Sequence, residues 1–260
     1  MCHKRDLGLI LNLKKCNFAL PKVRLVGHII RSGQRRADPE KMAAVRDMQP
    51  PQTKKQVRQI MGFFSYFRDY IPSFAELAKP LCDLTSKRIP TNIPWGLEQS
   101  KAFEQLKQKL CQTTNESLRI VDFTKPFTIH VDTSNFQVAG LLSQPARDGS
   151  ERPVAFISLK LNPTQRAWAT VEKEAFAVIW ALKRFRNWIF GKPVTIYTDH
   201  NPLTYLTSSA PSSAKLTRWA LAIQQYDVTF CYKAGQKNVA ANCLSWAQMG
   251  SDGAPAPQEW

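Results

Sequence analysis

The sequence predicts an α/β fold for residues 119–247, with a separate and mostly helical segment in front of it. Three observations predict this division. After residue 120, strand-like runs rich in β-branched residues alternate with stretches of helical periodicity. Before it, helical patterns predominate, and the polar stretch 112–118 separates the two regions. The length of 260 residues gives room for two domains.

The N-terminal stretch has β character. Residues 23–30, VRLVGHII, are rich in β-branched side chains and have the length of one strand, and the following RSGQ at 31–34 is typical of a turn. An apolar run at 7–13 could pair with this strand, but two strands make too small a sheet to be stable alone. We therefore expect residues 1–36 to be a piece of a larger sheet.

Residues 37–118 carry the patterns of short helices. Asp38 is a candidate N-cap, followed by Pro39 at the first helical position, and Pro50 ends that helix. Thr53 and Gln56 form a capping box for a second helix. Further helical pieces are expected at 77–84 and 100–110, with a Pro-containing polar loop at 86–97 between them.

After residue 119 the expected elements are three strands, a helix, a strand, a helix, a strand and a helix. This order is typical of one mixed sheet with flanking helices. The expected strands lie at 127–132, 138–144, 154–161, 194–199 and 228–233, and the expected helices at 164–188, 215–225 and 238–246. Residues 248–260 are rich in Pro and small residues, so we expect a disordered tail.

The charge balance points to a polyanionic partner. Lys and Arg number 36 against 20 Asp and Glu, which gives a formal net charge of +16. The first 120 residues hold 22 of the basic and 10 of the acidic residues. Clustered Lys and Arg bind phosphates by releasing counterions, so nucleic acid is favoured over a merely solvated basic surface.

The six cysteines include no Cys-x-x-Cys pair, which disfavours a zinc site and favours reduced thiols. Lys4, Arg5 and Asp6 interrupt any apolar run at the N-terminus, so no secretory signal is expected. No stretch of 18 apolar residues is present, and no membrane association is expected. These patterns predict an intracellular protein of the cytoplasm or nucleus.

Four carboxylates are candidates for chemistry. Asp132 and Asp199 each end an expected strand, where ligands bind in α/β folds, although such an Asp commonly only caps a turn. Glu172 and Glu174 border opposite sides of the apolar stripe of the 164–188 helix, and helical spacing does not choose between them. Clustered carboxylates suit Mg²⁺, and two such ions about 4 Å apart support phosphodiester hydrolysis.

Residues 1–247 resemble the C-terminal part of the reverse transcriptase of a gypsy-type LTR retrotransposon (retrovirus-like) Pol polyprotein, continuing through its ribonuclease H domain. The strings that carry the resemblance in the first half are LGLILNLKKCNF at 7–18, VGHII at 26–30, DPEKMAAV at 38–45 and VRQIMGFFSYFRDYIPSFAELAKPL at 57–81. In the second half they are FTIHVDTSNF, VEKEAFAVIWALKRFRNWIFG, VTIYTDHNPL, KLTRWALAIQQYDVTF and AGQKNVAANCLSW.

The resemblance implies a ribonuclease H-like mixed five-stranded sheet with flanking helices over 119–247. Residues 1–36 would be a palm remnant with the primer grip, and 37–118 a helical thumb with connecting helices. Asp132, Glu174 and Asp199 would hold two Mg²⁺ ions, with Mn²⁺ as an alternative, for endonucleolytic hydrolysis of the RNA in RNA–DNA hybrids. Contacts to hybrid or duplex nucleic acid would come from Val26, Gly27, His28, Lys54, Lys55, Arg58 and Arg68.

Two departures from the family pattern keep a second hypothesis open. The Tyr-x-Asp-Asp polymerase motif of the family would lie before residue 1, so DNA synthesis is not expected, and the polymerase part of Pol is a candidate partner. Asn242 replaces the family's fourth carboxylate, and Asn135, Gln137 and Ala139 replace an Asp and two glycines. The chain is therefore either a metal-dependent ribonuclease H or a catalytically inactive nucleic-acid-binding relic or repurposed domain.

Overall fold

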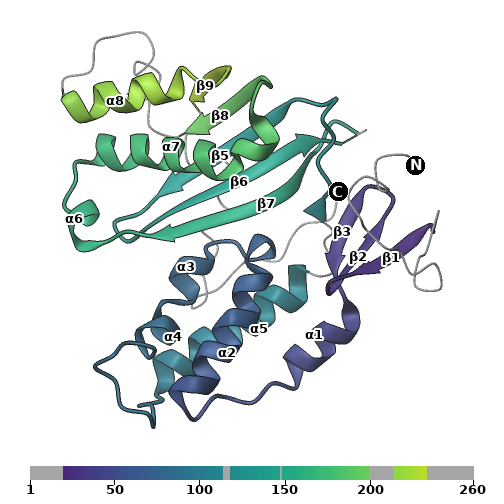
Figure 1. Cartoon of the computed structure of the whole chain (residues 1–260), viewed down its shortest axis with the longest axis vertical. Helices are drawn as coiled ribbons and strands as arrows, with labels where there is room; N and C mark the ends of the chain where they lie inside the picture. The colour runs from purple at the N-terminus through teal and green to yellow at the C-terminus, as the bar shows by residue number, and fades with distance from the viewer. Residues whose placement is uncertain (1–19, 114–117, 147, 199–212, 233–260) are drawn as a thin grey trace, which may run out of the picture.

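The computed structural model describes residues 20–113, 118–146, 148–198 and 213–232 (Figure 1). They form a four-stranded sheet in the order β1-β2-β3-β4 and a five-stranded sheet in the order β7-β6-β5-β8-β9. Helices α1 to α5 lie on one side of the five-stranded sheet, and α7 and α8 lie on the other (Figure 1). Within these ranges, no helix combines the length and the apolar character needed to cross a membrane.

The small sheet begins with β1 (Lys22–Leu25), β2 (His28–Arg31) and β3 (Gln34–Ala37), paired antiparallel in sequence order. The expectation of one strand over 23–30 is wrong, because a two-residue turn folds that stretch into a hairpin. Val26 and Gly27 have φ values of 47° and 76°, the combination that a type I′ turn requires. The turn expected at 31–34 is confirmed, with Ser32 and Gly33 in the same region of φ.

The helical part contains α1 (Pro39–Arg46), α2 (Lys54–Tyr66), the 3₁₀ helix η3 (Arg68–Tyr70), α3 (Phe74–Leu77), α4 (Lys79–Asp83) and α5 (Leu97–Thr113). Both predicted caps are confirmed: Asp38 accepts a hydrogen bond from the amide of Glu40, and Thr53 and Gln56 form the capping box. The helical piece expected at 77–84 is present as α4, with Pro80 in its first turn, and the preceding α3 was not predicted.

The mixed five-stranded sheet predicted from the sequence is confirmed. Its strands are β5 (Phe127–Thr133), β6 (Gln137–Pro145), β7 (Glu151–Lys160), β8 (Val194–Thr198) and β9 (Val228–Tyr232). The hairpin strands β5, β6 and β7 pair antiparallel, and β8 lies parallel between β5 and β9. A short strand that the sequence did not predict, β4 (Leu118–Arg119), pairs with β3 of the small sheet.

The helices of this half are α6 (Pro163–Arg166), α7 (Thr170–Ile189) and α8 (Ala214–Ile223). The single helix expected over 164–188 is wrong, because the backbone leaves helical geometry before Thr170, where Ala169 has a ψ of 153°. Trp168, in this break, packs against Phe176 and Trp219. The expected helix at 238–246, the run at 7–13 and the tail at 248–260 lie outside the described residues.

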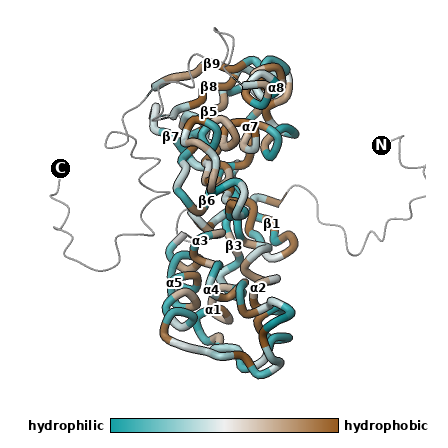
Figure 2. Tube along the Cα trace, turned by 90° about the vertical axis from the view of Figure 1, so that its left-hand side faces the viewer, coloured by the Kyte–Doolittle hydropathy of each residue, from teal (hydrophilic) through white to brown (hydrophobic). Residues whose placement is uncertain are grey.

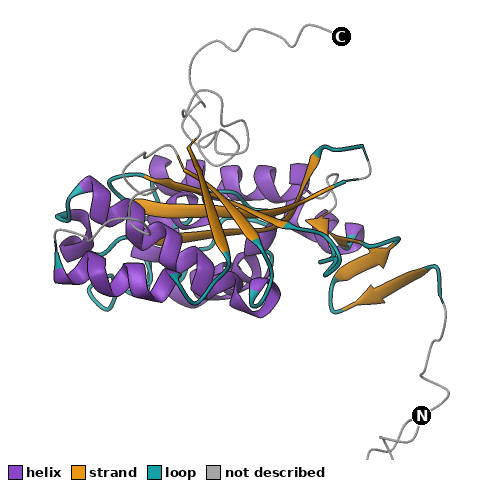
Figure 3. Cartoon of the chain, turned by 90° about the horizontal axis from the view of Figure 1, so that it is seen from above, coloured by secondary structure: helices purple, strands orange, loops and turns teal. Residues whose placement is uncertain are grey.

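Strand β6, between β7 and β5, is buried on both faces, and its side chains alternate between two hydrophobic cores. Val138 and Leu142 belong to the core that includes α7, whereas Ala139 and Leu141 belong to the core of the helical part. Hydrophobic segments accordingly run through the sheet layer and through the helices beneath it (Figure 2). Seen from above, the strands cross between helices while the β1–β2 hairpin projects to one side (Figure 3).

Candidate active site

Asp132 lies near the end of β5, the strand in the middle of the sheet. It is partly buried and pairs with Ala139 of β6, while β8 flanks β5 on its other side. Its neighbours Val131 and Ile129 point into the α7 core, so alternation places the Asp132 side chain on the opposite face of the strand. The strand-end position expected from the sequence is therefore present.

Glu174 brings a second carboxylate to the same end of β5, from the α7 face of the strand, whereas Asp132 lies on the opposite face. It lies in the second turn of α7 with only 5% of its surface exposed, and its Oε1 accepts a hydrogen bond from the hydroxyl of Thr133, the residue after Asp132. Glu172 instead forms an ion pair with Lys215 of α8, with 3.3 Å between Oε1 and Nζ. The choice that helical spacing left open is thus made by packing, since only Glu174 contacts β5.

The turn after β5 is held by further hydrogen bonds. The Ser134 hydroxyl accepts from the amides of Phe136 and Gln137 at 3.2 and 3.1 Å, and the buried Lys173 donates to Asn135 Oδ1 at 3.2 Å. Adjacent residues of α7 therefore fix both Thr133 and Asn135. Asn135, which stands where the family pattern has an Asp, has a structural role in this turn.

A buried polar cluster supports β5 just before Asp132. His130 is 1% exposed, its Nε2 lies 2.7 Å from Glu151 Oε2, and its ring stacks on Tyr197 of β8 at 5.1 Å between centroids. The Ser143 hydroxyl donates to the same Glu151 oxygen at 3.1 Å. These contacts connect β5 to β6, β7 and β8, so Asp132 extends from a strand with fixed neighbours.

The remaining two expected site residues, Asp199 and Asn242, lie outside the described residues. β8 ends at Thr198, directly before Asp199, and β8 pairs with β5. Within the described part of the chain, no group of three or more His, Cys, Asp or Glu residues could hold a metal ion. Asp132 and Glu174 nevertheless supply carboxylate oxygens, the ligand type that Mg²⁺ prefers, so the donor chemistry fits a divalent cation.

Residues 122–226 match the family model of the RNase H-like domain found in reverse transcriptase. Over 94% of its length the chain is 37% identical to the retrovirus-related Pol polyprotein from transposon opus, and over 92% it is 32% identical to that from transposon gypsy, both of Drosophila melanogaster. Nearly the whole chain is therefore similar to one part of the retrovirus-related Pol polyproteins of these transposons. It spans about a quarter of those relatives, covering 26% and 24% of their lengths.

Solved structures of foamy viral protease-reverse transcriptase share the fold. The one in complex with an RNA/DNA hybrid superposes with a TM-score of 0.71 and 23% identity, covering 96% of this chain and 34% of that one. The structure of foamy viral protease-reverse transcriptase dRH in complex with double-stranded DNA superposes with a TM-score of 0.69 and 21% identity. It covers 82% of this chain and 38% of that one. The ribonuclease H-like fold predicted from the sequence is therefore confirmed.

Of the expected primer-grip residues, Val26 and Gly27 form the β1–β2 turn and His28 begins β2. Val26 is 72% exposed, but His28 is a structural residue that stacks on Tyr66 and Tyr70 at centroid distances of 5.3 and 5.6 Å. His28 Nδ1 also lies 3.1 Å from the Tyr70 hydroxyl oxygen. Burial, and then the nearby Arg35 charge, lower the pKa of His28. Of these expected contact residues, Val26 in the turn is therefore accessible to a ligand, whereas the His28 ring is engaged in stacking.

The four expected thumb contacts separate into two groups. Lys54 donates to the carbonyls of Ser86 and Ile89, and Arg58 donates to that of Thr85, so both hold the following loop. Lys55 is exposed beside them. Arg68 is near the other end of the 13-residue α2, which spans about 20 Å. Arg68 is partly buried, and that burial lowers its pKa.

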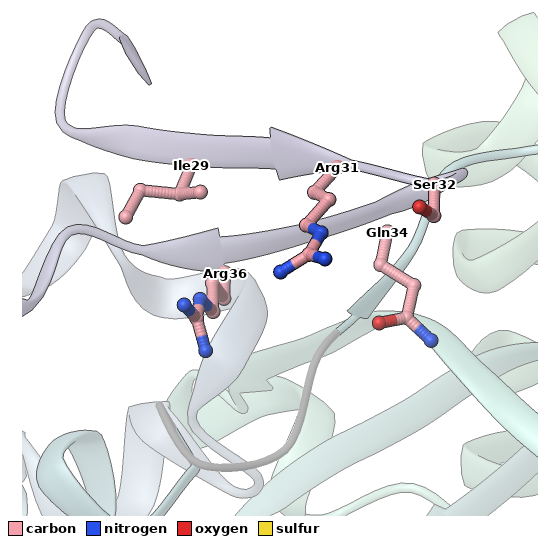
Figure 4. Close-up of a pocket in the computed structure, with 5 residues that line it drawn as sticks. All are labelled: Ile29, Arg31, Ser32, Gln34 and Arg36. Atoms are coloured by element: carbon pink, nitrogen blue, oxygen red, sulfur yellow. The ribbon is translucent and has the colours of Figure 1, made fainter. Parts of the chain in front are cut away.

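A cavity that the sequence did not reveal lies on the β2–β3 hairpin. It has a volume of about 350 Å³ and is lined by Ile29, Arg31, Ser32, Gln34 and Arg36. Figure 4 shows the Arg31 and Arg36 side chains reaching into the same space. The register pairs Ile29 with Arg36 and Arg31 with Gln34, which places these residues on one face. Counting outward from the two-residue turn at Ser32-Gly33 could have predicted this grouping.

Proposed function

We propose that this chain is a metal-dependent ribonuclease H that hydrolyses the RNA strand of RNA–DNA hybrids. The observation that carries the proposal is the contact of Glu174 with Thr133, which brings a helix carboxylate to the strand end that holds Asp132. The family match over 122–226 supports the reaction class. The foamy viral relative was solved with an RNA/DNA hybrid, and we extend that substrate class to this chain as part of the proposal.

Asp132 and Glu174, with Asp199 from the sequence, are the proposed oxygen ligands of Mg²⁺. When bound, such ions activate water and stabilise the leaving oxygen of a phosphodiester. The residues of the chain position these ligands: Thr133 orients the Glu174 carboxylate, and Lys173 and Ser134 hold the turn that follows Asp132. The basic excess of the first half, the exposed Val26 turn and the face that carries Arg31 and Arg36 support the proposal that the chain binds a nucleic-acid duplex.

We also propose the domain division expected from the sequence, with a palm remnant at 1–36, thumb and connecting helices at 37–118 and the ribonuclease H-like domain at 119–247. Among the described residues, β1 pairs with β2 on one side only. An exposed strand edge is a template for a further strand, so the polymerase part of Pol is the proposed partner of this small sheet.

The test is cleavage of a labelled RNA–DNA hybrid by the purified chain in Mg²⁺ or Mn²⁺. Asp132→Asn and Glu174→Gln remove proposed ligands, so each should reduce cleavage by more than the roughly 10–100-fold that loss of an outer-shell partner costs. Glu172→Gln is the matched control, because Glu172 is ion-paired to Lys215 instead, and it should keep most activity. Undiminished cleavage by Asp132→Asn would overturn the proposed site.

One feature of the sequence favours the second hypothesis, an inactive nucleic-acid-binding domain. Asn242 replaces a carboxylate of the family pattern, and a neutral amide is a weaker Mg²⁺ ligand. If the enzyme hypothesis is correct, Asn242→Asp should raise cleavage at low Mg²⁺ concentration, and Mn²⁺ should recover part of the deficit in the unchanged chain. Hybrid binding without cleavage in either metal, before and after Asn242→Asp, would favour the binding relic.

A further inference from the structure

A second cavity lies where the helical part meets the ribonuclease H-like domain. It has a volume of about 200 Å³, and its lining includes Glu76 of α3, Lys79 of α4, Phe136 and Gln137 at the β5–β6 turn, Lys160 of β7 and Arg166 of α6. Figure 1 shows α3 beneath β7. The cavity therefore adjoins the turn that follows Asp132.

Three cationic side chains converge on this cavity from three different elements. Lys160 is paired with Asp83, with 3.0 Å between Nζ and Oδ1. Lys79 has no ion pair with any described residue, and its Nζ lies 5.7 Å from the centroid of the Phe136 ring. Arg166 lies 5.3 Å from the same centroid and donates through Nε to the Leu161 carbonyl. No described residue accepts from the terminal amino groups of Arg166.

Hydrogen bonds join the elements that form the walls of the cavity. The Ala75 amide donates to the Ser158 hydroxyl at 2.8 Å, which fixes α3 to β7. Gln137 is 6% exposed, and its Nε2 donates to Glu76 Oε2 at 2.7 Å. Gln137 Oε1 is buried without a hydrogen-bond partner in the described part of the chain. The cavity thus holds two cations that have no carboxylate partner among the described residues, beside the Glu76 carboxylate, which accepts from Gln137.

We propose that this junction cavity binds a backbone phosphate of a nucleic-acid strand as it enters the ribonuclease H-like site. Arg166 offers its terminal amino groups for bidentate recognition of phosphate, and Lys79 adds a point charge. Phe136, which is 52% exposed, presents a ring on which a base can stack. Because the cavity adjoins the turn that follows Asp132, we infer that its ligand is a phosphate of a nucleic-acid strand and not a free phosphate ion. The choice of hybrid rests on the proposed function, but binding does not require cleavage.

The test measures hybrid binding by the full chain in EDTA over a series of salt concentrations. In Lys79→Gln/Arg166→Gln the stems can still pack on Phe136, but both charges are lost. Losing one phosphate contact should lower the slope of log affinity against log salt by about 0.9 and weaken binding equally for all sequences. The matched control is Lys87→Gln/Arg88→Gln in the exposed loop after α4, which should keep the slope. Equal slopes in both variants would overturn the proposal.

Two further measurements keep the result decisive. If the double variant fails to fold, Arg166→Lys keeps the charge and loses the bidentate geometry, so it should weaken hybrid binding with an unchanged melting temperature; unchanged binding would reject the site. Calorimetric titration with inorganic phosphate at constant ionic strength distinguishes the sources. If inorganic phosphate binds but the double variant keeps the salt dependence of hybrid binding, the cavity is a site for free anions. That result would reject binding of a nucleic-acid strand there. Because EDTA excludes cleavage, an inactive chain can still pass this test.

Discussion

The two sheets of this chain differ in how they are covered. In β6 of the five-stranded sheet, every residue except the last is buried, whereas all four residues of β1 in the small sheet are exposed. The β1–β2 pairing is regular, whereas the register of β6 with β7 shifts between Leu142 and Ser143, and the small sheet has two turns with favourable geometry. Pairing and turn residues thus fix the shape of a hairpin, but its stability depends on apolar faces being covered.

The cover of the large sheet comes from both halves of the sequence. Ala139, Leu141 and Phe156 share a hydrophobic cluster with Phe64 and Phe103 of the helical part. The helices that precede residue 113 therefore supply one of the two layers that enclose the ribonuclease H-like sheet, and α7 supplies the other. If this comparison is correct, damage to the large sheet should cost far more than equal damage to the small one.

The largest effect is expected for Leu142→Ala in β6. Leu142 is fully buried, and truncating such a residue costs about 2–5 kcal/mol of unfolding free energy through lost burial and a residual cavity. Val23→Ala in β1 is the matched change, and because Val23 is 36% exposed it should cost at most about 0.5 kcal/mol. Urea unfolding of both variants tests this, and similar losses would break the comparison.

Hydrogen exchange should show the next largest difference. The amides of β2 and β3 should exchange at least about 100-fold faster than those of β8, a difference of about 2.8 kcal/mol in opening free energy. The reason is that the small sheet can open without disrupting the α7 core. Equal protection of the two sheets, measured by mass spectrometry on the native chain, would show that they unfold as one unit.

A smaller effect is expected at the junction between the helical part and the large sheet. Glu76→Ala leaves the buried Gln137 amide without its acceptor, which should cost about 1–3 kcal/mol. Glu98→Ala, at an exposed acid in the first turn of α5, should cost at most about 0.5 kcal/mol. Thermal unfolding of both variants provides the measurement, and a difference within error would mean that solvent reaches Gln137.

The smallest expected effect is a pH dependence at His28, which connects the small sheet to α2. Burial holds the pKa of folded His28 below its ordinary value of 6.5, so the unfolded chain binds the proton more readily. The stability that His28 contributes is therefore present above about pH 6.5 and is lost as pH falls from there through the lower pKa of the folded state. His28→Phe keeps the stacked ring and cannot titrate, so its melting temperature should fall less between about pH 8 and pH 5. Parallel curves for both proteins would exclude His28 as the cause.

Local sequence determined most of the elements. The caps at Asp38 and Thr53, the turn at 31–34 and the strands of the large sheet follow from neighbouring residues, because capping bonds and side-chain alternation act over a few positions. Asp132 could likewise be placed at a strand end from the pattern alone. The positions of these features could be predicted without knowing what packs against them.

Tertiary structure decided where local patterns were neutral. Glu172 and Glu174 flank the same apolar stripe, and only contact with Thr133 of β5 distinguishes Glu174. At the Val26 hairpin, the Tyr66 hydroxyl donates to the Val26 carbonyl. At the helix break, Trp168 packs against Trp219. The burial of both faces of β6 also required helices from the first half of the chain. Each of these outcomes depends on residues tens of positions away, so no local window of the sequence contains the interaction that decides it.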